Sequence, residues 1–351
     1  MTESPDGLAR FRGILRRFTT PLLPDDYTVL ANPLWSKREL RGKIESVERC
    51  PDDTIHLVIR PGWGVPVTFE AGQYIGIGLR VDGRYTWRSY SLTNVPDTRD
   101  GLFSITIRAV EKGKLSTHLV GTARPGINVR LAAPAGDFHL TDPLPEKLLF
   151  VTAGSGVTPV IAMLRSMEGR RDSTDIKVVH SVRNRSDLIF EDVLEDYDAH
   201  IQVTSEEGRV SPQVLEKLVP DFRERVVYAC GPATMLDELE SWASDNDLEI
   251  RVERFTLDRA SDAKGGTITF ARSNVETTVD GATTILEAGE AAGVQMPFGC
   301  RMGICHGCLT PLASGTVRDV RTGDLTTAPE GQPLPVQTCI SEAAGPCHLD
   351  R

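Results

Sequence analysis

Three cysteines lie close together near the end of the chain, in the segment PFGCRMGICHGCLT at residues 297–310. Cys300, Cys305 and Cys308 have the spacing C-x4-C-x2-C, and Cys339 follows in VQTCIS. This spacing is typical of a plant-type [2Fe–2S] centre, in which four thiolates converge on two irons. We therefore predict that a glycine-containing loop supplies three ligands and that a distant strand supplies the fourth.

Zinc is the alternative occupant of such a site. A structural zinc site usually has two short cysteine pairs, or a cysteine pair with a histidine pair. Here the fourth cysteine stands alone, which favours iron and sulfur. His306 as a ligand would suggest a Rieske-type centre, but four cysteines suffice without it. We expect His306 to be a loop residue and Cys347 to lie outside the ligand set.

The length and composition set the context for this site. A chain of 351 residues suits two or three domains. No apolar run is long enough for a transmembrane helix, and the N-terminal residues lack the apolar run of a secretory signal. We therefore expect a cytoplasmic protein, where clustered cysteines usually bind metal or do redox chemistry. The formal net charge of −10 argues against nucleic acid as a partner.

Residues 41–140 consist of short segments of alternating hydrophobicity separated by turns such as VDGR. This pattern predicts an antiparallel β-barrel. Within it, the RSYS segment places Arg88, Tyr90 and Ser91 on one strand, and this combination of a planar cation, a ring and hydroxyls suits a phosphate joined to a flat ring system. The later segment GKLS, residues 113–116, can begin a helix whose N–H groups face a second phosphate.

Residues 146–258 alternate apolar strands with helical segments, which predicts a parallel, doubly wound sheet. Such sheets bind nucleotides at the carboxyl ends of their strands. The segment AGSGVTP lies where the first strand meets the first helix, and Gly154 and Gly156 permit a tight turn there. A helix N-terminus at this point can hold a diphosphate, although the Rossmann fingerprint is incomplete.

The order of these motifs is more specific than any one of them. RxYS, GxxS, GxGxxP and CGP follow one another, together with FEAGQY, APAGDF and ERF. This order resembles the ferredoxin–NADP reductase superfamily, and residues 265–345 resemble plant-type ferredoxins. The combination resembles the reductase components of oxygenases, hydroxylases and lipid desaturases. The resemblance implies an N-terminal extension at 1–40, an FAD-binding barrel at 41–143, an NAD(P)-binding domain at 144–258 and an α+β, β-grasp [2Fe–2S] ferredoxin domain at 263–351.

The resemblance also implies roles for individual residues. The expected flavin contacts are Arg88, Tyr90, Ser91, Gly113, Leu115, Ser116 and Phe255. The expected contacts of the nicotinamide nucleotide are Gly154, Gly156, Val157, Thr158, Cys230 and Gly231. Among these, Cys230, Tyr90 and Ser91 are expected to lie at the reacting rings. We expect FAD, while FMN stays open because the related phthalate dioxygenase reductases use FMN with the same motifs.

The choice between NADPH and NADH depends on the end of the second strand of the predicted parallel sheet. There HSVRNR offers Ser181, Arg183 and Arg185, and the planar guanidinium of arginine matches the oxygens of a 2′-phosphate. This favours NADPH. Asp187 follows closely, and because an acid suits the ribose hydroxyls of NADH, that coenzyme stays open.

The expected reaction passes a hydride from the nicotinamide to the flavin, and single electrons from the flavin to the cluster and on to an acceptor. One alternative is an electron-transfer subunit permanently bound to a larger dehydrogenase. The long gap between Cys308 and Cys339 instead favours a full ferredoxin domain. Another alternative is a zinc-bound interaction module on a degenerate reductase, against which the intact RSYS, GSGVTP and CGP motifs argue.

The N-terminal segment GLARFRGILRRF has apolar residues at helical spacing among arginines. Such a helix, at about residues 7–19, can lie on an anionic membrane surface at the inner face, dock on a partner or pack on the protein's own body. The following proline-rich stretch resembles bacterial reductases paired with membrane fatty-acyl desaturases or alkane hydroxylases. We therefore expect a membrane diiron desaturase or hydroxylase as the acceptor.

Overall fold

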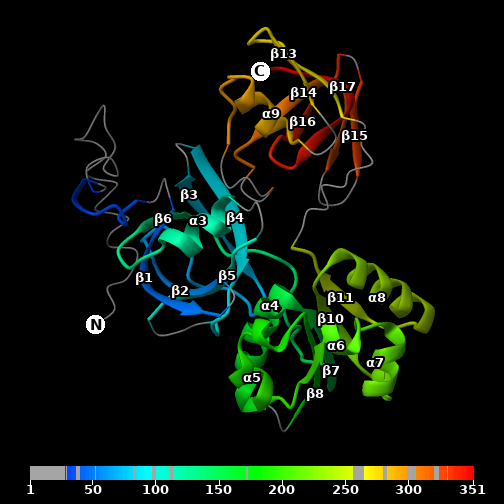
Figure 1. Ribbon diagram of the computed structural model, residues 1–351. Coiled ribbons are helices and arrows are strands. Elements are labelled where there is room, and N and C mark those ends of the chain that lie inside the picture. Colours follow the sequence, from blue (N-terminus) through cyan, green and yellow to red (C-terminus); the bar gives the residue numbers. More distant parts are fainter. Residues whose placement is uncertain are drawn as a thin grey trace. The chain divides into compact units, whose positions relative to one another are not determined.

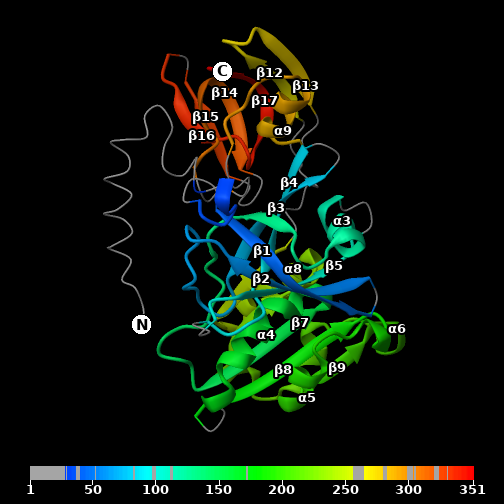
Figure 2. The same ribbon diagram turned by 90° about the vertical axis from the view of Figure 1, so that its left-hand side faces the viewer.

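Figures 1 and 2 show the computed structural model from two directions. The structure describes residues 28, 30–36, 40–51, 53–81, 84–96, 100–110, 114–170, 173–255, 265–279, 283–298, 303, 306–319, 324–329 and 331–351. The chain divides into two compact units. The first holds the described residues among 1–144, 158–172 and 186–193, and the second holds those among 145–157, 173–185 and 194–351.

An antiparallel sheet forms most of the first unit. Its strands are β1 (Arg41–Cys50), β2 (Thr54–Pro61), β3 (Tyr74–Val81), β4 (Arg84–Ser91), β5 (Phe103–Arg108) and β6 (Asn128–Leu131). They follow the spatial order β4-β3-β6-β1-β2-β5, and a bridge between Leu92 and Ile105 links the two edges (Figure 1). Helix α3 (Lys114–Thr122) packs beside β4 and β5. The predicted antiparallel barrel is confirmed.

Alternation along each strand of this sheet explains its formation. In β2, Ile55, Leu57 and Ile59 are fully buried, whereas Arg60 is exposed. A period of two places every second side chain on one face, so each strand contributes an apolar row to a shared core. Leu115 of α3 is buried in the same core.

A parallel sheet lies in the second unit, with the order β11-β10-β7-β8-β9. Its strands are β7 (Lys147–Ala153), β8 (Asp175–Val182), β9 (His200–Val203), β10 (Val226–Cys230) and β11 (Ile250–Glu253). The α-helices between and after these strands are α4 (Val157–Ser166), α5 (Glu191–Asp196), α6 (Thr204–Glu207), α7 (Pro212–Leu218) and α8 (Ala233–Asn246). Of these, α4 from Thr158 onward and α5 up to Val193 belong to the first unit. The predicted doubly wound type of sheet is confirmed.

One face of the parallel sheet packs against α7 and α8. Val151 and Ala229 of the sheet are buried in one apolar cluster with Leu215 of α7 and Leu236 of α8. Because the strands are parallel and in register, the residues that alternate with these face the other way. Thr152, His180 and Cys230 belong to that second set.

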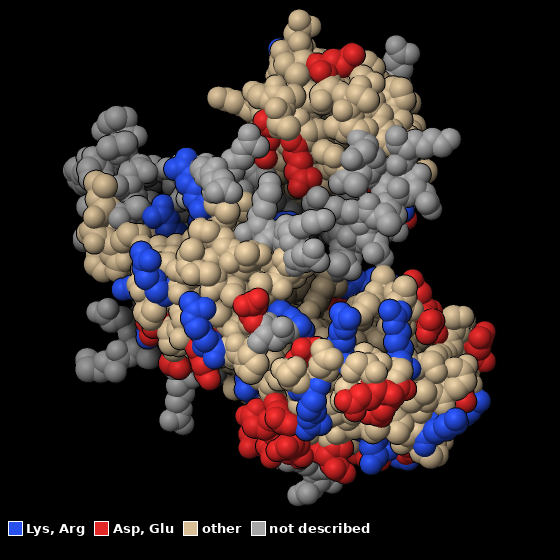
Figure 3. All heavy atoms as spheres, viewed as in Figure 1, with Lys and Arg blue, Asp and Glu red and all other residues tan. Residues whose placement is uncertain are grey.

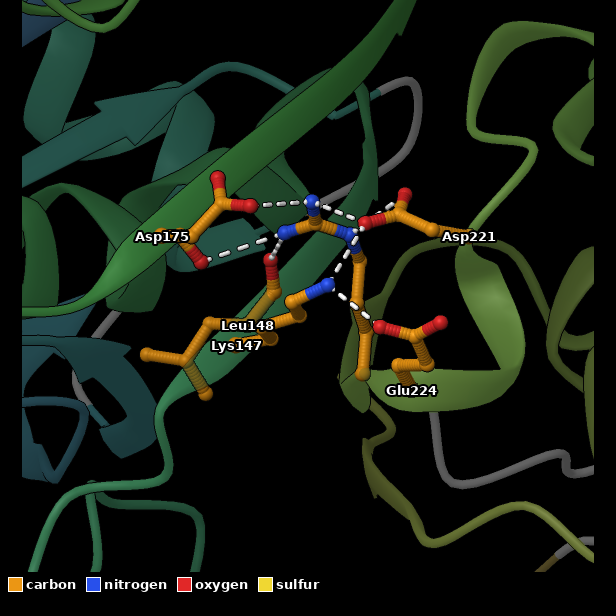
Figure 4. A network of polar contacts seen from close by, with 6 residues as sticks. Lys147, Leu148, Asp175, Asp221 and Glu224 are labelled. Carbon is orange, nitrogen blue, oxygen red and sulfur yellow. Dashed lines mark hydrogen bonds and ion pairs between the residues drawn. The ribbon is translucent and has the colours of Figure 1, made fainter.

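The amino-terminal edge of the parallel sheet is held by Arg225, whose side chain is 1% exposed. Its Nη2 lies 2.6 Å from Asp175 Oδ2 and 2.7 Å from Asp221 Oδ2. Its Nη1 donates to the carbonyl oxygens of Leu148 and Asp175 (Figure 4). Lys147 adds ion pairs to Asp221 and Glu224. Arg225 therefore joins the starts of β7 and β8 to the segment that enters β10.

A mixed sheet forms the C-terminal part of the chain, in the order β13-β12-β17-β14-β15, with β16 paired to β14. Its elements are β12 (Gly266–Phe270), β13 (Val275–Val279), α9 (Ile285–Ala291), β14 (Leu309–Asp319), β15 (Leu325–Ala328), β16 (Leu334–Gln337) and β17 (Ser341–Leu349). Thr284 and Glu287 form a capping box at the start of α9. Ile285, Leu286 and Ala288 are buried, as the spacing predicts. The α+β class is confirmed.

Candidate active site

Cys308 and Cys339 bring two of the four predicted cluster ligands together. Their sulfur atoms lie 3.2 Å apart, both side chains are buried, and neither is in a disulfide. The hydrogen bond shared with Cys339 lowers the pKa of the Cys308 thiol to about 6, although burial acts in the opposite direction. Two adjacent thiols, one of them readily ionised, fit a metal–sulfur centre. Cys300 and Cys305 lie outside the described residues.

The structure corrects the position of the fourth ligand. Cys339 lies in a turn between β16 and β17, and not on a strand as predicted. The turn is held by side chains beside the cysteine. Thr338 Oγ1 donates to the Cys308 carbonyl at 3.0 Å, and Gln337 Nε2 donates to the Gly303 carbonyl at 2.8 Å. The role of Gln337 and Thr338 was not predicted from the sequence. The only sign of it there is their position directly before the predicted ligand Cys339.

The two residues excluded from the ligand set have the expected places. His306 is exposed, in a loop position with φ of 53°. Cys347 is fully buried in β17, and burial raises the pKa of its thiol to about 11. A neutral thiol in an apolar core acts as a small hydrophobic side chain.

Strand β4 carries Arg88, Tyr90 and Ser91. The Tyr90 ring packs against the barrel core, and its hydroxyl is buried without a hydrogen-bond partner among the described residues. Burial raises the pKa of Tyr90, so the phenol stays a neutral donor. Ser91 is buried and Arg88 is exposed, with Nη1 donating to the Trp87 carbonyl. A buried hydroxyl without a partner beside a cationic side chain fits a polar aromatic ligand.

Helix α3 begins at Lys114, directly after Gly113, which lies outside the described residues. Ser116 Oγ accepts a hydrogen bond from the Val110 N–H at 3.2 Å. Leu115 points into the core, so only its backbone is available to a ligand. Because α3 packs beside β4, the structure brings the two predicted flavin segments together.

The turn between β7 and α4 is a short 3₁₀ helix, Gly154–Gly156, which the sequence did not predict. Gly154 has φ of +54°, a conformation that favours glycine. A Cβ on Gly156 would lie 2.2 Å from the Cys230 carbonyl oxygen, so this close approach requires glycine. Val157 and Thr158 follow and are both buried. The GxGxxP and CGP motifs therefore meet at the carboxyl edge of the parallel sheet.

Cys230 is fully buried at the end of β10. Burial raises the pKa of its thiol well above the usual range, and Glu253 raises it further. The thiol is therefore neutral, which suits contact with a ring and not nucleophilic attack. Gly231 follows directly, close to Ala153.

The end of β8 places Ser181 opposite Ala153, so it borders the same edge. Ser181 is buried, and no described residue bonds its Oγ. Arg183 and Arg185 are exposed in the segment that follows. Phe255 is 43% exposed after β11.

His180, which neighbours Ser181, was not among the site residues predicted from the sequence. It is fully buried, and its Nδ1 lies 2.8 Å from Thr152 Oγ1. Burial lowers the pKa of His180 to about 4, so the ring is neutral. The sign of a buried histidine in the sequence was its position within the apolar run IKVVHSV.

Comparisons with known proteins agree with this geometry. Family models match residues 43–140 as an oxidoreductase FAD-binding domain, 150–241 as an oxidoreductase NAD-binding domain and 268–344 as a 2Fe-2S iron-sulfur cluster binding domain. A relative from Mycobacterium tuberculosis, named NADPH oxidoreductase, is 47% identical, and the match covers 98% of this chain and 93% of that protein. The chain belongs to the ferredoxin–NADP reductase superfamily. It is a member with a C-terminal ferredoxin domain.

Other proteins match most of the length of this reductase. The stachydrine N-demethylase reductase subunit of Rhizobium meliloti is 26% identical, over 83% of this chain and 91% of that protein. The solved structure of phthalate dioxygenase reductase has a TM-score of 0.61 at 24% identity, covering 89% of this chain and 98% of that one. The second likeness supports the fold.

The reductase is an NAD(P)H-dependent oxidoreductase that uses FAD, a [2Fe–2S] cluster and a pyridine nucleotide, in agreement with the cofactors predicted from the motifs. Within the described part of the chain, no helix is long and apolar enough to cross a membrane.

Proposed function

We propose that this chain is the NADPH-dependent reductase component of an oxygenase system and that its acceptor is a membrane fatty-acyl desaturase or alkane hydroxylase. The relative from Rhizobium meliloti is named a demethylase reductase subunit, and another from Chromohalobacter salexigens is named a glycine betaine monooxygenase reductase subunit. These names support a separate acceptor protein. Membrane contact through residues 7–19 stays a prediction, because they lie outside the described residues.

We assign the flavin to β4 and the start of α3. Arg88 would pair with a phosphate, Ser91 and the α3 N–H groups would bind polar groups of the flavin, and Tyr90 would contact its ring system. When bound, the flavin takes two electrons from reduced nicotinamide and releases them singly to the cluster. Cys300, Cys305, Cys308 and Cys339 hold that cluster.

The preference for NADPH is supported by the side chains at the end of β8. Ser181 Oγ is buried without a described partner, and Arg183 and Arg185 follow it. Asp187, the acid that would suit NADH, lies 3.9 Å from Arg108 in an ion pair. An acid paired with a cation is a poorer acceptor for ribose hydroxyls, whereas the exposed arginines suit a phosphate.

Replacing both Arg183 and Arg185 by alanine tests this preference. We expect kcat/KM for NADPH to fall about 100-fold and that for NADH to change less than about 3-fold, since charge-assisted bonds to a phosphate contribute about 1.5–3 kcal/mol. Lys177→Ala is the matched control, because this exposed lysine lies at the other end of β8. An equal loss with both coenzymes would contradict the assignment.

The acceptor is tested by adding membranes that contain the candidate desaturase or hydroxylase. The proposal expects NADPH oxidation to depend on the acyl or alkane substrate. Oxidation that is the same with and without that substrate would exclude this acceptor.

A further inference from the structure

Arg165 links the last turn of α4 to the chain just beyond the flavin strand. Its Nη1 donates to the carbonyl oxygen of Thr93 at 2.7 Å. Thr93 is fully buried and lies two residues after Ser91. Helix α4 begins at Val157, within the GSGVTP segment. One side chain therefore connects the helix that begins in the nucleotide motif to the segment that directly follows the strand of the flavin motif.

The same guanidinium lies over the ring of Phe190, with 5.4 Å between Arg165 Cζ and the ring centroid. The His56 ring meets Phe190 edge-on at 6.4 Å. Phe190 has φ of +59°, which is strained for a bulky side chain and persists only where the surroundings hold it. The contacts with Arg165 and His56 supply that restraint.

Phe190 ends the segment that carries the coenzyme-selecting residues. That segment runs from Ser181 through Arg183 and Arg185, and Asp187 adds its ion pair to Arg108 of β5. Two contacts therefore hold residues 187–190 to the barrel, the ion pair of Asp187 with Arg108 and the ring contact of Phe190 with His56. Arg165 packs on the same Phe190 ring and so supports the second contact.

Packing alone does not explain a cation at this position. Burial lowers the pKa of Arg165, which means that the charged form is disfavoured here. An apolar side chain of similar length would also cover Phe190 without that desolvation cost. The guanidinium differs from such a side chain because it donates to the Thr93 carbonyl and faces the Phe190 ring at the same time. It therefore fixes the position of the ring relative to Thr93.

We propose that Arg165 is a positioning residue for hydride transfer, which clamps residues 187–190, directly after the proposed coenzyme-selecting residues, to the segment that follows the flavin strand. The inference rests on the flavin and nucleotide sites proposed above. The reaction moves one proton with two electrons from C4 of the reduced nicotinamide to N5 of the oxidised flavin, leaving oxidised nicotinamide and reduced flavin. A displacement of about 1 Å between reacting groups costs about 100-fold in rate.

The test uses the full-length holoprotein with Arg165→Met and Phe190→Gly. Glycine tolerates the positive φ, so Phe190→Gly removes the ring without adding strain. Arg165 also borders an open cavity of about 420 Å³, so water can fill the space that methionine leaves. Arg60→Met is the matched control, since Arg60 makes an exposed ion pair with Glu45 on the same barrel.

Three readouts separate positioning from folding. Anaerobic stopped-flow absorption gives the limiting rate of flavin reduction by saturating NADPH and the long-wavelength charge-transfer band between the two rings. Flavin content and the thermal midpoint report integrity. Hydrogen–deuterium exchange of the 186–193 peptide reports the clamp itself, with or without coenzyme.

We expect both variants to lose about 10-fold to 100-fold in the limiting rate, with a weaker charge-transfer band and faster exchange at 186–193, while flavin content matches Arg60→Met. Rates equal to that control would overturn the proposal, as would a rate loss that only tracks flavin loss. If Arg165→Met does not retain flavin, Phe190→Gly decides by the same criteria. Failure of the wild-type flavin to be reduced by NADPH would instead refute the proposed function.

Discussion

Three buried cysteines show that the surroundings of a thiol decide its chemistry. Burial alone raises the pKa of Cys347 to about 11, and burial together with Glu253 raises the pKa of Cys230 well above its usual range. Cys308 differs because Cys339 lies 3.2 Å away, and their hydrogen bond lowers the Cys308 pKa to about 6. Among the buried cysteines that the structure describes, the pair at Cys308 and Cys339 is therefore the one prepared for metal binding, which requires thiolates.

Cys308→Ser, which replaces one sulfur atom by oxygen, tests whether Cys308 is a metal ligand and Cys347 is not. We expect the iron content and the visible absorption of the cluster to fall at least about 10-fold, because a ligand loss costs at least as much as the loss of an outer-shell partner. Reduction of the flavin by NADPH should continue. Cys347→Ala is the control and should keep its iron. Loss of iron in the control to the same extent would show that core packing, and not ligation, explains the result.

The residue types and spacings made much of the site predictable. The ligand pattern, the RSYS strand and the two glycines of GSGVTP all stand in contiguous segments. Phe190 was not predictable, because its positive φ depends on Arg165 and His56, which are distant in sequence. His180 was hidden for a similar reason, since its bond to Thr152 joins two strands.

At the scale of elements, the Arg225 network holds the start of β7 and β8 beside the entry to β10 (Figure 4). The guanidinium is nearly inaccessible, but Asp175 and Asp221 are 48% and 34% exposed. Solvent therefore screens both ion pairs, and each contributes modestly. The carbonyl of Leu148 matters more, because its burial leaves it few other donors.

Arg225→Met should therefore lower the free energy of opening of β10 by about 1–3 kcal/mol at pH 7, because the buried Leu148 carbonyl loses a donor. Hydrogen–deuterium exchange of residues 226–230 measures this locally, which avoids treating a multidomain chain as two-state. Arg254→Met is the control. Its ion pairs with Asp237 and Glu240 are more exposed, so its loss should cost less than about 1 kcal/mol.

The same network predicts an acid dependence. The hydrogen bond from Arg225 is the main cause that lowers the pKa of Asp221 from 3.8 to about 2. A lowered carboxyl pKa contributes stability that is present above about pH 4 and is lost as pH falls towards 2. Exchange of β10, corrected for intrinsic rates, should show this loss in the wild type. A similar loss in Arg225→Met would argue against Arg225 as the cause.

The types of the elements were predictable because the spacing of hydrophobic residues along the sequence differs between strands and helices. Alternation marked β1 to β6, continuous apolar runs marked β7, β8 and β10, and helical spacing marked α9. Two details were not predictable. The 3₁₀ turn at Gly154–Gly156 closely approaches the distant Cys230 carbonyl, and the turn that carries Cys339 is held by the hydrogen bond from Thr338 to Cys308. A local pattern contains no information on those partners.

At the scale of the whole molecule, one chain carries three cofactor-binding regions. The net charge of −10 is not evenly spread over the viewed face in Figure 3. The described surface of the C-terminal sheet shows mainly uncharged side chains there, whereas that of the parallel sheet shows both signs. On this face, therefore, the described surface of the nucleotide-binding region is more charged than that of the C-terminal sheet.

The central claim is that electrons pass from NADPH through the flavin to the cluster of this chain. An anaerobic titration of the purified holoprotein with NADPH, followed by visible absorption and repeated with NADH, tests it most directly. Because FAD takes two electrons and the cluster one, we expect both absorption bands to bleach at about 1.5 NADPH per chain, with NADH needed at a far higher concentration. Bleaching of the flavin while the cluster band persists, or no bleaching with either coenzyme, would contradict the account.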